Sequence, residues 1–426
     1  MTESTVAVVS LLVLGWAIIS GPLARHNITG PLLFMVAGHL LGNPDWGPLS
    51  VDVEAPAIHV VAELALALVL FSDASRVNIP DLRRDLSLPV RLLAIGLPLS
   101  VIFGGLLAAG LLDDLPWALA GFLGAALAPT DAALSVQVIN DERIPMRPRR
   151  ALNVESGLND GIATPIVTVM LAVAAVQLGI ESESESVEAG TALRELGAGV
   201  VVGLVHGYGG ALVMSWAARH TWIVGGGRRL ATLGVAISAF AVTLAIDGNA
   251  FIAAFVAGIA FRARLDDDVA EIERVGELPE LGGELLGLVV WFLFGATLIP
   301  VAVEHLDAPI VAYALASLTI VRMLPVALCM ARSGLDRPSV LFVGWFGPRG
   351  LASVVFALLA IEELGETEPL ANQAVAAVAL TVLLSVVLHG VTAGPGGRRY
   401  VQRERSGSEG ALRARPSVLS DSHHPR

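Results

Sequence analysis

The chain has 426 residues, of which 54% are hydrophobic and 15% charged, and its net charge is −12. A typical soluble domain is about 45–50% apolar and about 25% charged, whereas here the apolar excess lies in runs roughly long enough to cross a ~30 Å hydrocarbon core. This composition excludes a soluble enzyme, a nucleic-acid-binding protein and a disordered scaffold. All 27 basic residues are arginine, and the single Cys329 excludes an internal disulfide and any metal site of several cysteines.

Thirteen apolar segments are predicted to span the membrane as helices, so the fold class is an all-α polytopic membrane protein. In chain order the spans are 6–22, 27–42, 57–73, 88–111, 116–138, 150–177, 192–217, 229–246, 249–263, 285–303, 309–331, 338–361 and 372–392. The acidic start MTEST lacks the positively charged beginning of a signal peptide, so we expect the first span to be retained.

Arginine is distributed unevenly over the loops between these spans. Seventeen arginines, from Arg25 to Arg337, lie in alternate loops, and the opposite loops hold only Arg194 together with acids such as the run ESESES at 181–186. The positive-inside rule therefore predicts an external N-terminus and a cytoplasmic C-terminus in the plasma membrane. Residues 396–426 are polar and arginine-rich without helical periodicity, so we expect a disordered cytoplasmic tail near anionic lipid rather than a regulatory domain.

Spans seven apart in the chain share short motifs. The shared motifs are Val-Ala-Gly at 36–38 and 256–258, Leu-Phe at 70–71 and 293–294, and the proline-centred segments APTDAALS around Pro129 and FGPRGLAS around Pro348. Because seven is odd, the two copies are inverted in the membrane, which predicts six-helix repeats at about 6–177 and 229–392, linked by span 192–217, within a transmembrane domain of residues 1–395. Inverted repeats with interrupted helices are typical of transporters, whose site lies where the breaks meet. Two ordinary proline kinks are the alternative.

Charged residues inside a membrane are costly and usually mark a transport pathway or an ion pair. Those at membrane depth here are Glu63, Asp73, Asp131, Glu155, Asp160, Arg322 and Arg349. The excess of acids over bases suits a cation. We assign no role to Glu63.

The sixth span contains VESGLNDG, in which Ser156 and Asp160 share one helix face with Asn159 beside them. A carboxylate, a hydroxyl and an amide oxygen are hard ligands suited to Na⁺, Li⁺ or K⁺. In the fifth span, Thr130 and Asp131 follow the Pro129 break, where we expect them to be presented together with freed backbone carbonyls.

Three further charged side chains have predicted roles. Asp73 ends the third span as either a cation ligand or an interfacial acid near Arg76. Glu155 points away from Ser156 and is expected to pair with the buried Arg322, as architecture rather than transport chemistry. Arg349 is expected to supply fixed positive charge at the break in the twelfth span.

With these motifs the chain resembles the sodium/proton exchanger superfamily, in the NhaP-like branch of monovalent cation/proton antiporter family 1, from about Val6 to Leu388. The resemblance rests on LFSDAS, APTDAALS, VESGLNDG, VRMLPV and FGPRGLAS. It implies an NhaA-like antiporter fold with broken crossing helices, and a homodimer that contacts through the first three spans and the middle of the chain. It also implies Asp160 as the carrier carboxylate, helped by Asn159 and Ser156, with Thr130, Asp131 and Asp73 as cation ligands.

The resulting hypothesis is exchange of Na⁺ or Li⁺ for H⁺, in which the two ions compete for Asp160. Its neighbour is the neutral Asn159 rather than a second aspartate, so one cation per proton and electroneutral exchange are expected. A K⁺/H⁺ antiporter is the nearest alternative, and no cofactor or resident metal is expected. A cation channel would need a continuous pore lining. An intramembrane aspartyl protease would need a tyrosine before Asp131 and a second glycine before Asp160, and neither is present.

Overall fold

The computed structural model describes residues 3–26, 28–51, 55–76, 87–131, 133–135, 138, 141–180, 189–265 and 275–413. Within these ranges all regular structure is helical. The first half contains α1 (Glu3–Arg25), α2 (Gly30–Gly42), α3 (Pro56–Arg76), α5 (Ser87–Arg91), η1 (Leu92–Gly96), α6 (Leu97–Leu111), α7 (Trp117–Ala126), η2 (Ala133–Ser135), α9 (Met146–Gln177) and α10 (Ala189–Arg219).

The second half continues from α11 to a long C-terminal helix. It contains α11 (Gly225–Leu244), α12 (Ala250–Arg264), α14 (Glu277–Leu293), η3 (Phe294–Leu298), α15 (Ile299–Glu304), α16 (Ala308–Ala316), η4 (Ser317–Val321), α17 (Arg322–Cys329), α18 (Arg337–Trp345), α19 (Leu351–Leu364) and α20 (Pro369–Arg413). Here η1, η3 and η4 are π-helical turns within longer helices, and η4 directly precedes Arg322.

Each of the thirteen predicted spans contains at least one of these helices, which confirms the predicted fold class. Among the described residues nine helices are long and apolar enough to cross a membrane, and α2 and α7 are shorter apolar helices. The chain is therefore a multi-pass membrane protein. Two predicted spans are interrupted, one after α7 and one between α18 and α19.

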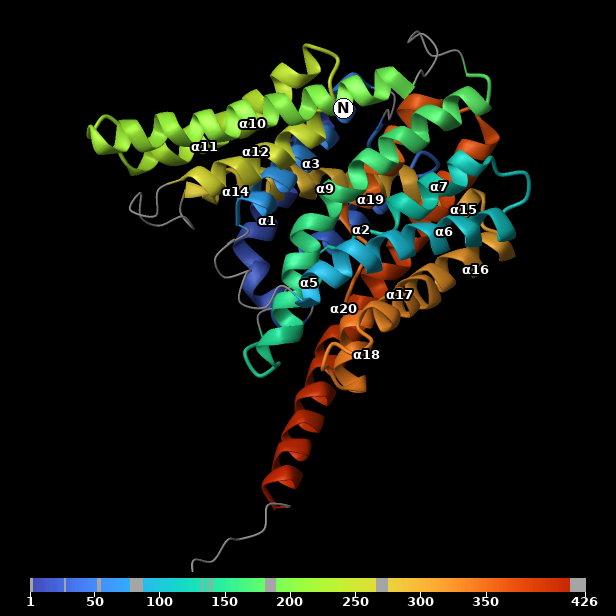
Figure 1. Cartoon of the computed structure of the whole chain (residues 1–426). Helices are drawn as coiled ribbons and strands as arrows, with labels where there is room; N and C mark the ends of the chain where they lie inside the picture. Colours follow the sequence, from blue (N-terminus) through green and yellow to red (C-terminus); the bar gives the residue numbers. More distant parts are fainter. Residues whose placement is uncertain are drawn as a thin grey trace, which may run out of the picture.

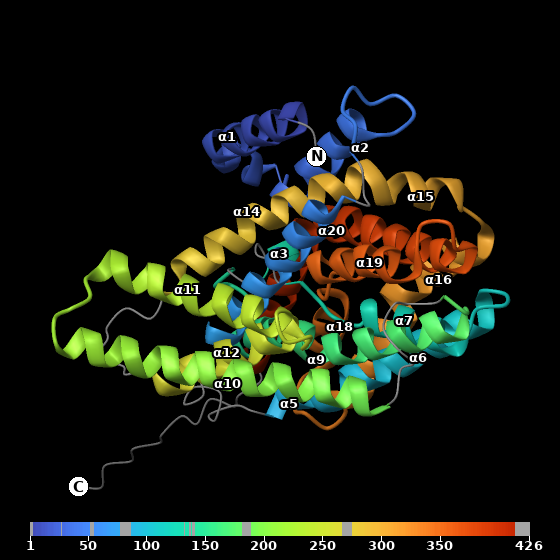
Figure 2. The ribbon, with the colours of Figure 1, turned by 90° about the horizontal axis from the view of Figure 1, so that it is seen from above.

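The helices form two groups with α9 and α19 between them. Figure 1 shows α10, α11 and α12 side by side along one side of the molecule, where α12 also packs on α3. On the other side α6 packs on α7, and α16 packs on α20. Figure 2 shows α1 and α2 at the edge of the molecule next to α14. Because α9 contacts α3 and α12 as well as α7, its middle lies between the two groups.

The second and ninth spans are built and packed alike, in agreement with the predicted repeat. Thr29 caps the start of α2 by accepting from Leu32 N, and Asn249 caps α12 by accepting from Ile252 N. Each helix then uses the glycine of its Val-Ala-Gly motif for a backbone contact: Gly38 of α2 lies against the α14 backbone, and Gly258 of α12 lies against the α3 backbone. A side chain at either glycine would overlap that backbone, so only glycine permits the close approach.

The expectation of a non-helical tail from residue 396 is wrong for residues 396–413, because α20 continues to Arg413 and extends beyond the helical bundle (Figure 1). The extension is stabilised by contacts with α18: the rings of Tyr400 and Phe342 stack with centroids 4.4 Å apart, and Tyr400 Oη lies 2.6 Å from Ser339 Oγ. These are tertiary contacts, which helical periodicity does not reveal. Residues 414–426, the rest of the predicted tail, lie outside the described residues, as does the acidic run at 181–186.

Candidate functional site

The two interrupted helices meet at their breaks. α7 ends at Ala126, shortly before Pro129, whose nitrogen has no hydrogen to donate to a helix. Residues 346–350 separate α18 from α19. The backbone N–H of Asp131 donates to the carbonyl of Pro348 at 2.8 Å, so the two breaks are joined directly.

Asp131 and Arg349 each stabilise the half-helix of the other repeat. The Asp131 carboxylate accepts from the N–H of Leu351, the first residue of α19, at 3.1 Å, and from the N–H of Ala133 at 2.7 Å. Arg349 is fully buried, and its Nη1 donates to the carbonyls of Ala128 (2.8 Å) and Pro129 (3.1 Å) just beyond α7. A negative group thus lies at a helix N-terminus and a positive group beyond a helix C-terminus, as the helix dipole favours.

Most of the carbonyls at the end of α7 already accept a hydrogen bond from another segment of the chain. Besides the two carbonyls that accept from Arg349, Ala126 O accepts from Ser353 Oγ at 2.6 Å, and Thr130 O accepts from Ser156 Oγ at 2.6 Å. Buried carbonyls need a partner, and here other helices supply the donors. The sequence analysis missed Ser353, and it missed Ser385, whose Oγ accepts from Arg349 N at 2.7 Å. Ser353 follows the GPRG segment closely, which was the only available signal.

The middle of α9 presents oxygen atoms toward the same break. Ser156, Asn159 and Asp160 are buried, and Asn159 Nδ2 donates to Thr130 Oγ1 at 2.8 Å. That hydrogen bond turns the amide so that Asn159 Oδ1 is buried and has no hydrogen-bond partner among the described residues. No donor in the described part of the chain reaches the Asp160 carboxylate either. An acceptor left without a donor inside a protein is costly, and a bound cation or proton would satisfy it.

Asp73 lies beside this part of α9. A Cβ atom built on Gly157 would be 3.8 Å from Asp73 Cβ, so α3 and α9 pass close to each other there and only a side chain at residue 157 would fill the space between them. Arg76, three residues further along α3, forms an ion pair with Glu280 of α14, so both predicted roles of Asp73 stay open. The carboxylates of Asp131 and Asp73 are the charges that act most strongly on Asp160.

Glu155 and Arg322 form a two-pronged ion pair away from these oxygens. Arg322 Nη1 and Nη2 lie 2.5 and 2.8 Å from the two Glu155 oxygens, and each residue is only 2% exposed. Such paired geometry is the strong form of an arginine–carboxylate interaction. The pair joins α9 to α17.

Glu63, left without a role by the sequence, lies near Glu362 and Glu363 of α19. On the same helix as Glu63, His59 Nδ1 is 3.0 Å from Glu362 Oε2. These side chains belong to a different part of α3 from Asp73, which is ten residues further along the chain.

The described residues contain no cluster of three or more His, Cys, Asp or Glu arranged to hold a metal ion. Within α9 the oxygen set is the single carboxylate of Asp160 with the hydroxyl of Ser156 and the amide oxygen of Asn159, so one monovalent cation balances its charge. The oxygen set at α9 and the fifth-span break is therefore better suited to a monovalent cation.

The family model for "Sodium/hydrogen exchanger, transmembrane" matches residues 8–397. The chain belongs to this family. The matched range includes both breaks, all of α9 and the Glu155–Arg322 pair.

Two relatives of the chain are named for exchange of different ions. The K⁺/H⁺ antiporter NhaP of Alkalimonas amylolytica is 29% identical over 343 residues, which are 79% of this chain and 57% of that protein. The uncharacterized Na⁺/H⁺ exchanger Mb2309 of Mycobacterium bovis is 32% identical over 157 residues, 37% of this chain and 27% of that protein. The chain thus matches little more than half the length of the first relative and about a quarter of the second.

The fold is also that of a solved antiporter. The structure of the sodium proton antiporter MjNhaP1 from Methanocaldococcus jannaschii at pH 8 matches with a TM-score of 0.75 at 20% identity, over 93% of this chain and 98% of that chain. The antiporter fold expected from the sequence motifs is therefore present.

Proposed function

We propose that this protein is a secondary antiporter that exchanges a monovalent cation, Na⁺ first and Li⁺ with it, for H⁺. The observation that carries the proposal is the buried Asp160 carboxylate, which no donor in the described structure reaches and which lies beside the unpartnered Asn159 Oδ1. A carrier needs one group that binds either of two ions, and a carboxylate without a donor is such a group.

In the proposed mechanism Asp160 holds a proton or a cation, never both. The cation would be bound by the Asp160 carboxylate with oxygens of Asn159, Ser156 and Thr130. Asp73 and Asp131 would add negative charge nearby. Because Asp131 already accepts two backbone hydrogen bonds, we assign it to holding the break in place as well as to attracting the cation.

Electroneutral 1:1 exchange follows from this mechanism. The site carries the same charge when Asp160 is protonated and when it is ionised and holds a monovalent cation. Asn159 is neutral and adds no second titrating group. Each complete cycle then moves one positive charge in each direction.

K⁺/H⁺ exchange by the same site is the alternative, and it is supported by the name of the NhaP relative. Na⁺ and K⁺ share oxygen ligands, so the choice between them depends on the size of the oxygen cage rather than on the residue types. Both ions are therefore tested together below.

The test is exchange by purified protein in liposomes with an imposed pH gradient, read with a pH-sensitive dye as Na⁺, Li⁺ or K⁺ is added outside. We expect cation-dependent collapse of the gradient, the same when the membrane voltage is clamped at zero. Protein carrying Asp160→Asn, reconstituted at the same density, is the control. The proposal would be overturned if folded wild-type protein failed to collapse the gradient with any of the three cations. A voltage-dependent rate would overturn the 1:1 ratio.

We also propose a homodimer in the plasma membrane, with the N-terminus outside and the C-terminus in the cytoplasm. The uneven distribution of arginine supports the orientation. Labelling of single cysteines by an impermeant reagent tests it, using the exposed positions Ser4→Cys for the outside and Arg398→Cys for the inside in a chain whose Cys329 is replaced by Ser. Cross-linking of the intact protein in the membrane tests the dimer.

A further inference from the structure

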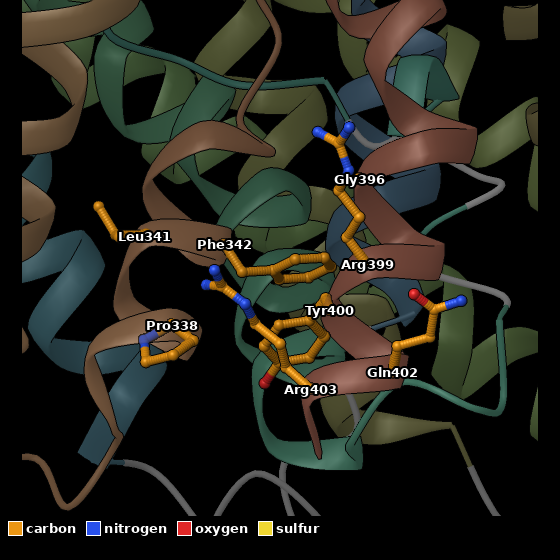
Figure 3. Close-up of a pocket in the computed structure, with 8 residues that line it drawn as sticks. All are labelled: Pro338, Leu341, Phe342, Gly396, Arg399, Tyr400, Gln402 and Arg403. Carbon is orange, nitrogen blue, oxygen red and sulfur yellow. The ribbon is translucent and has the colours of Figure 1, made fainter. Parts of the chain in front are cut away.

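A groove lies between the start of α18 and the extension of α20, remote from the proposed ion site. Its volume is about 670 Å³, and Figure 3 shows the side chains that line it. α18 contributes the apolar residues Pro338, Leu341 and Phe342, and α20 contributes Gly396, Arg399 and Arg403 among others. None of the residues that line the groove is acidic. The groove is thus apolar on one wall and basic on the other.

At the inner end of the groove, α18 and α20 are joined by side-chain contacts. Phe342 and Tyr400 stack with their ring centroids 4.4 Å apart, and the Tyr400 hydroxyl lies 2.6 Å from the buried Ser339 hydroxyl. Figure 3 shows the two rings one above the other between α18 and α20. Both helices are therefore held in a fixed relation across the groove.

Two arginines of α20 form the basic wall of the groove. Arg399 and Arg403 are four residues apart and so share one face of α20. Both are exposed, and neither has an ion-pair or hydrogen-bond partner among the described residues. In Figure 3 the Arg403 side chain runs beside the stacked rings. Two unpaired guanidinium groups at the edge of an apolar groove are suited to a phosphate group, which arginine binds in a forked geometry.

The wall of the groove formed by α18 is apolar and suited to an apolar ligand. Leu341 is 57% exposed. Pro338 is half-buried and also lines the groove, whereas Phe342 is buried beneath it. A free phosphate ion would contact the arginines and leave that surface uncovered. A molecule with a phosphate head and a hydrocarbon chain covers both walls.

The position of the groove indicates where such a molecule comes from. α18 begins at Arg337, and α20 leaves the helical bundle at the groove (Figure 1). Arg332 and Arg337 belong to the arginine-rich set of loops, which the positive-inside rule assigns to the cytoplasmic side. Basic pockets between helices at that surface bind the head groups of anionic lipids.

We propose that the groove between α18 and α20 binds an anionic phospholipid of the cytoplasmic leaflet. Arg399 and Arg403 hold its phosphate, and Pro338 and Leu341 contact its acyl chain. The proposal does not depend on the transported ion or on the exchange ratio, because its test measures lipid binding.

The test is titration of the purified full chain in a neutral detergent with phosphatidylglycerol, phosphatidylcholine and inorganic phosphate, with bound lipid measured by native mass spectrometry. The informative variant is Arg399→Gln with Arg403→Gln. Arg398→Gln is the matched control, because Arg398 is an exposed arginine of the same helix that does not line the groove. The midpoint of thermal unfolding without lipid establishes that each variant is folded.

We expect phosphatidylglycerol to bind wild type and Arg398→Gln equally, and to bind the double variant about 30-fold more weakly, which corresponds to about 1 kcal/mol for each arginine. Leu341→Gln keeps both arginines and should also weaken phosphatidylglycerol binding, without depending on the folding of the double variant. Equal binding of phosphatidylcholine would overturn the proposal. So would an equal loss in Arg398→Gln, or displacement of the lipid by inorganic phosphate.

Discussion

Asp131 and Arg349 each stabilise the half-helix at the opposite break. Asp131 accepts from the first N–H of α19, and Arg349 donates to the carbonyls beyond α7. Each residue comes from the break of one repeat and acts on the helix of the other. Neither is therefore simply an intramembrane charge that awaits a transported ion. These hydrogen bonds join the two breaks, whereas no donor among the described residues reaches the Asp160 carboxylate.

The first prediction separates Asp160 from Asp131. Asp160→Asn should abolish cation-dependent proton movement while the midpoint of thermal unfolding is unchanged or higher, because the native carboxylate receives no hydrogen bond and an uncharged group is easier to bury. Asp131→Asn should lower stability by about 1 kcal/mol, because an amide has one acceptor oxygen and cannot accept from both Leu351 N–H and Ala133 N–H. Dye-based exchange in liposomes and thermal unfolding in detergent measure the two effects. Full exchange by Asp160→Asn would exclude it as the carrier.

The second prediction concerns the Glu155–Arg322 pair. Glu155→Ala leaves a buried guanidinium without its partner and should lower stability by about 3–5 kcal/mol. The yield of folded protein in the membrane should fall accordingly. The double variant Glu155→Leu with Arg322→Met should recover much of this loss, since apolar residues of similar volume replace a buried pair at little cost. A double variant as unstable as Glu155→Ala would contradict a purely structural role.

The third prediction tests the close approach of the two breaks. A Cβ atom at Gly350 would overlap the Asp131 carboxylate, so Gly350→Ala should disrupt the cap of α19 and reduce both stability and exchange. The control is Gly390→Ala in α20, where a Cβ atom meets nothing within 4 Å. There alanine should be neutral or slightly stabilising, because it favours a helix over glycine by about 1 kcal/mol. Similar thermal unfolding of both variants would argue against the predicted contact.

The fourth prediction follows from competition for one carboxylate. Protons displace the cation by mass action, so the Na⁺ concentration for half-maximal exchange should rise as the pH falls, approaching about tenfold per pH unit at the acid end. The direction is fixed: acid weakens cation binding, and alkali restores it. Exchange rates at a series of Na⁺ concentrations and pH values measure it. A half-maximal concentration that is independent of pH would mean that the two ions use separate sites.

The sequence by itself determined the helical spans, because apolar length is a local property of the chain. It also paired the two proline breaks, since their motifs recur at one offset, and it proposed Glu155 with Arg322 because a buried arginine needs an acid. Resemblance of the motifs then identified the family to which the chain belongs. All of these inferences rest on residue type and spacing.

Only the tertiary structure decided which polar atoms are already used. Ser353 and Arg349 reach carbonyls more than 200 residues earlier in the chain, and Asp131 reaches forward to Leu351 over a similar distance. No local pattern encodes these partners, so the sequence could not distinguish the bonded Asp131 from the free Asp160. The contact of the α20 extension with α18 was hidden for the same reason, because Tyr400 stacks on Phe342 from a different helix. Hydrogen bonds and ring contacts between distant segments form only when the fold brings those segments together.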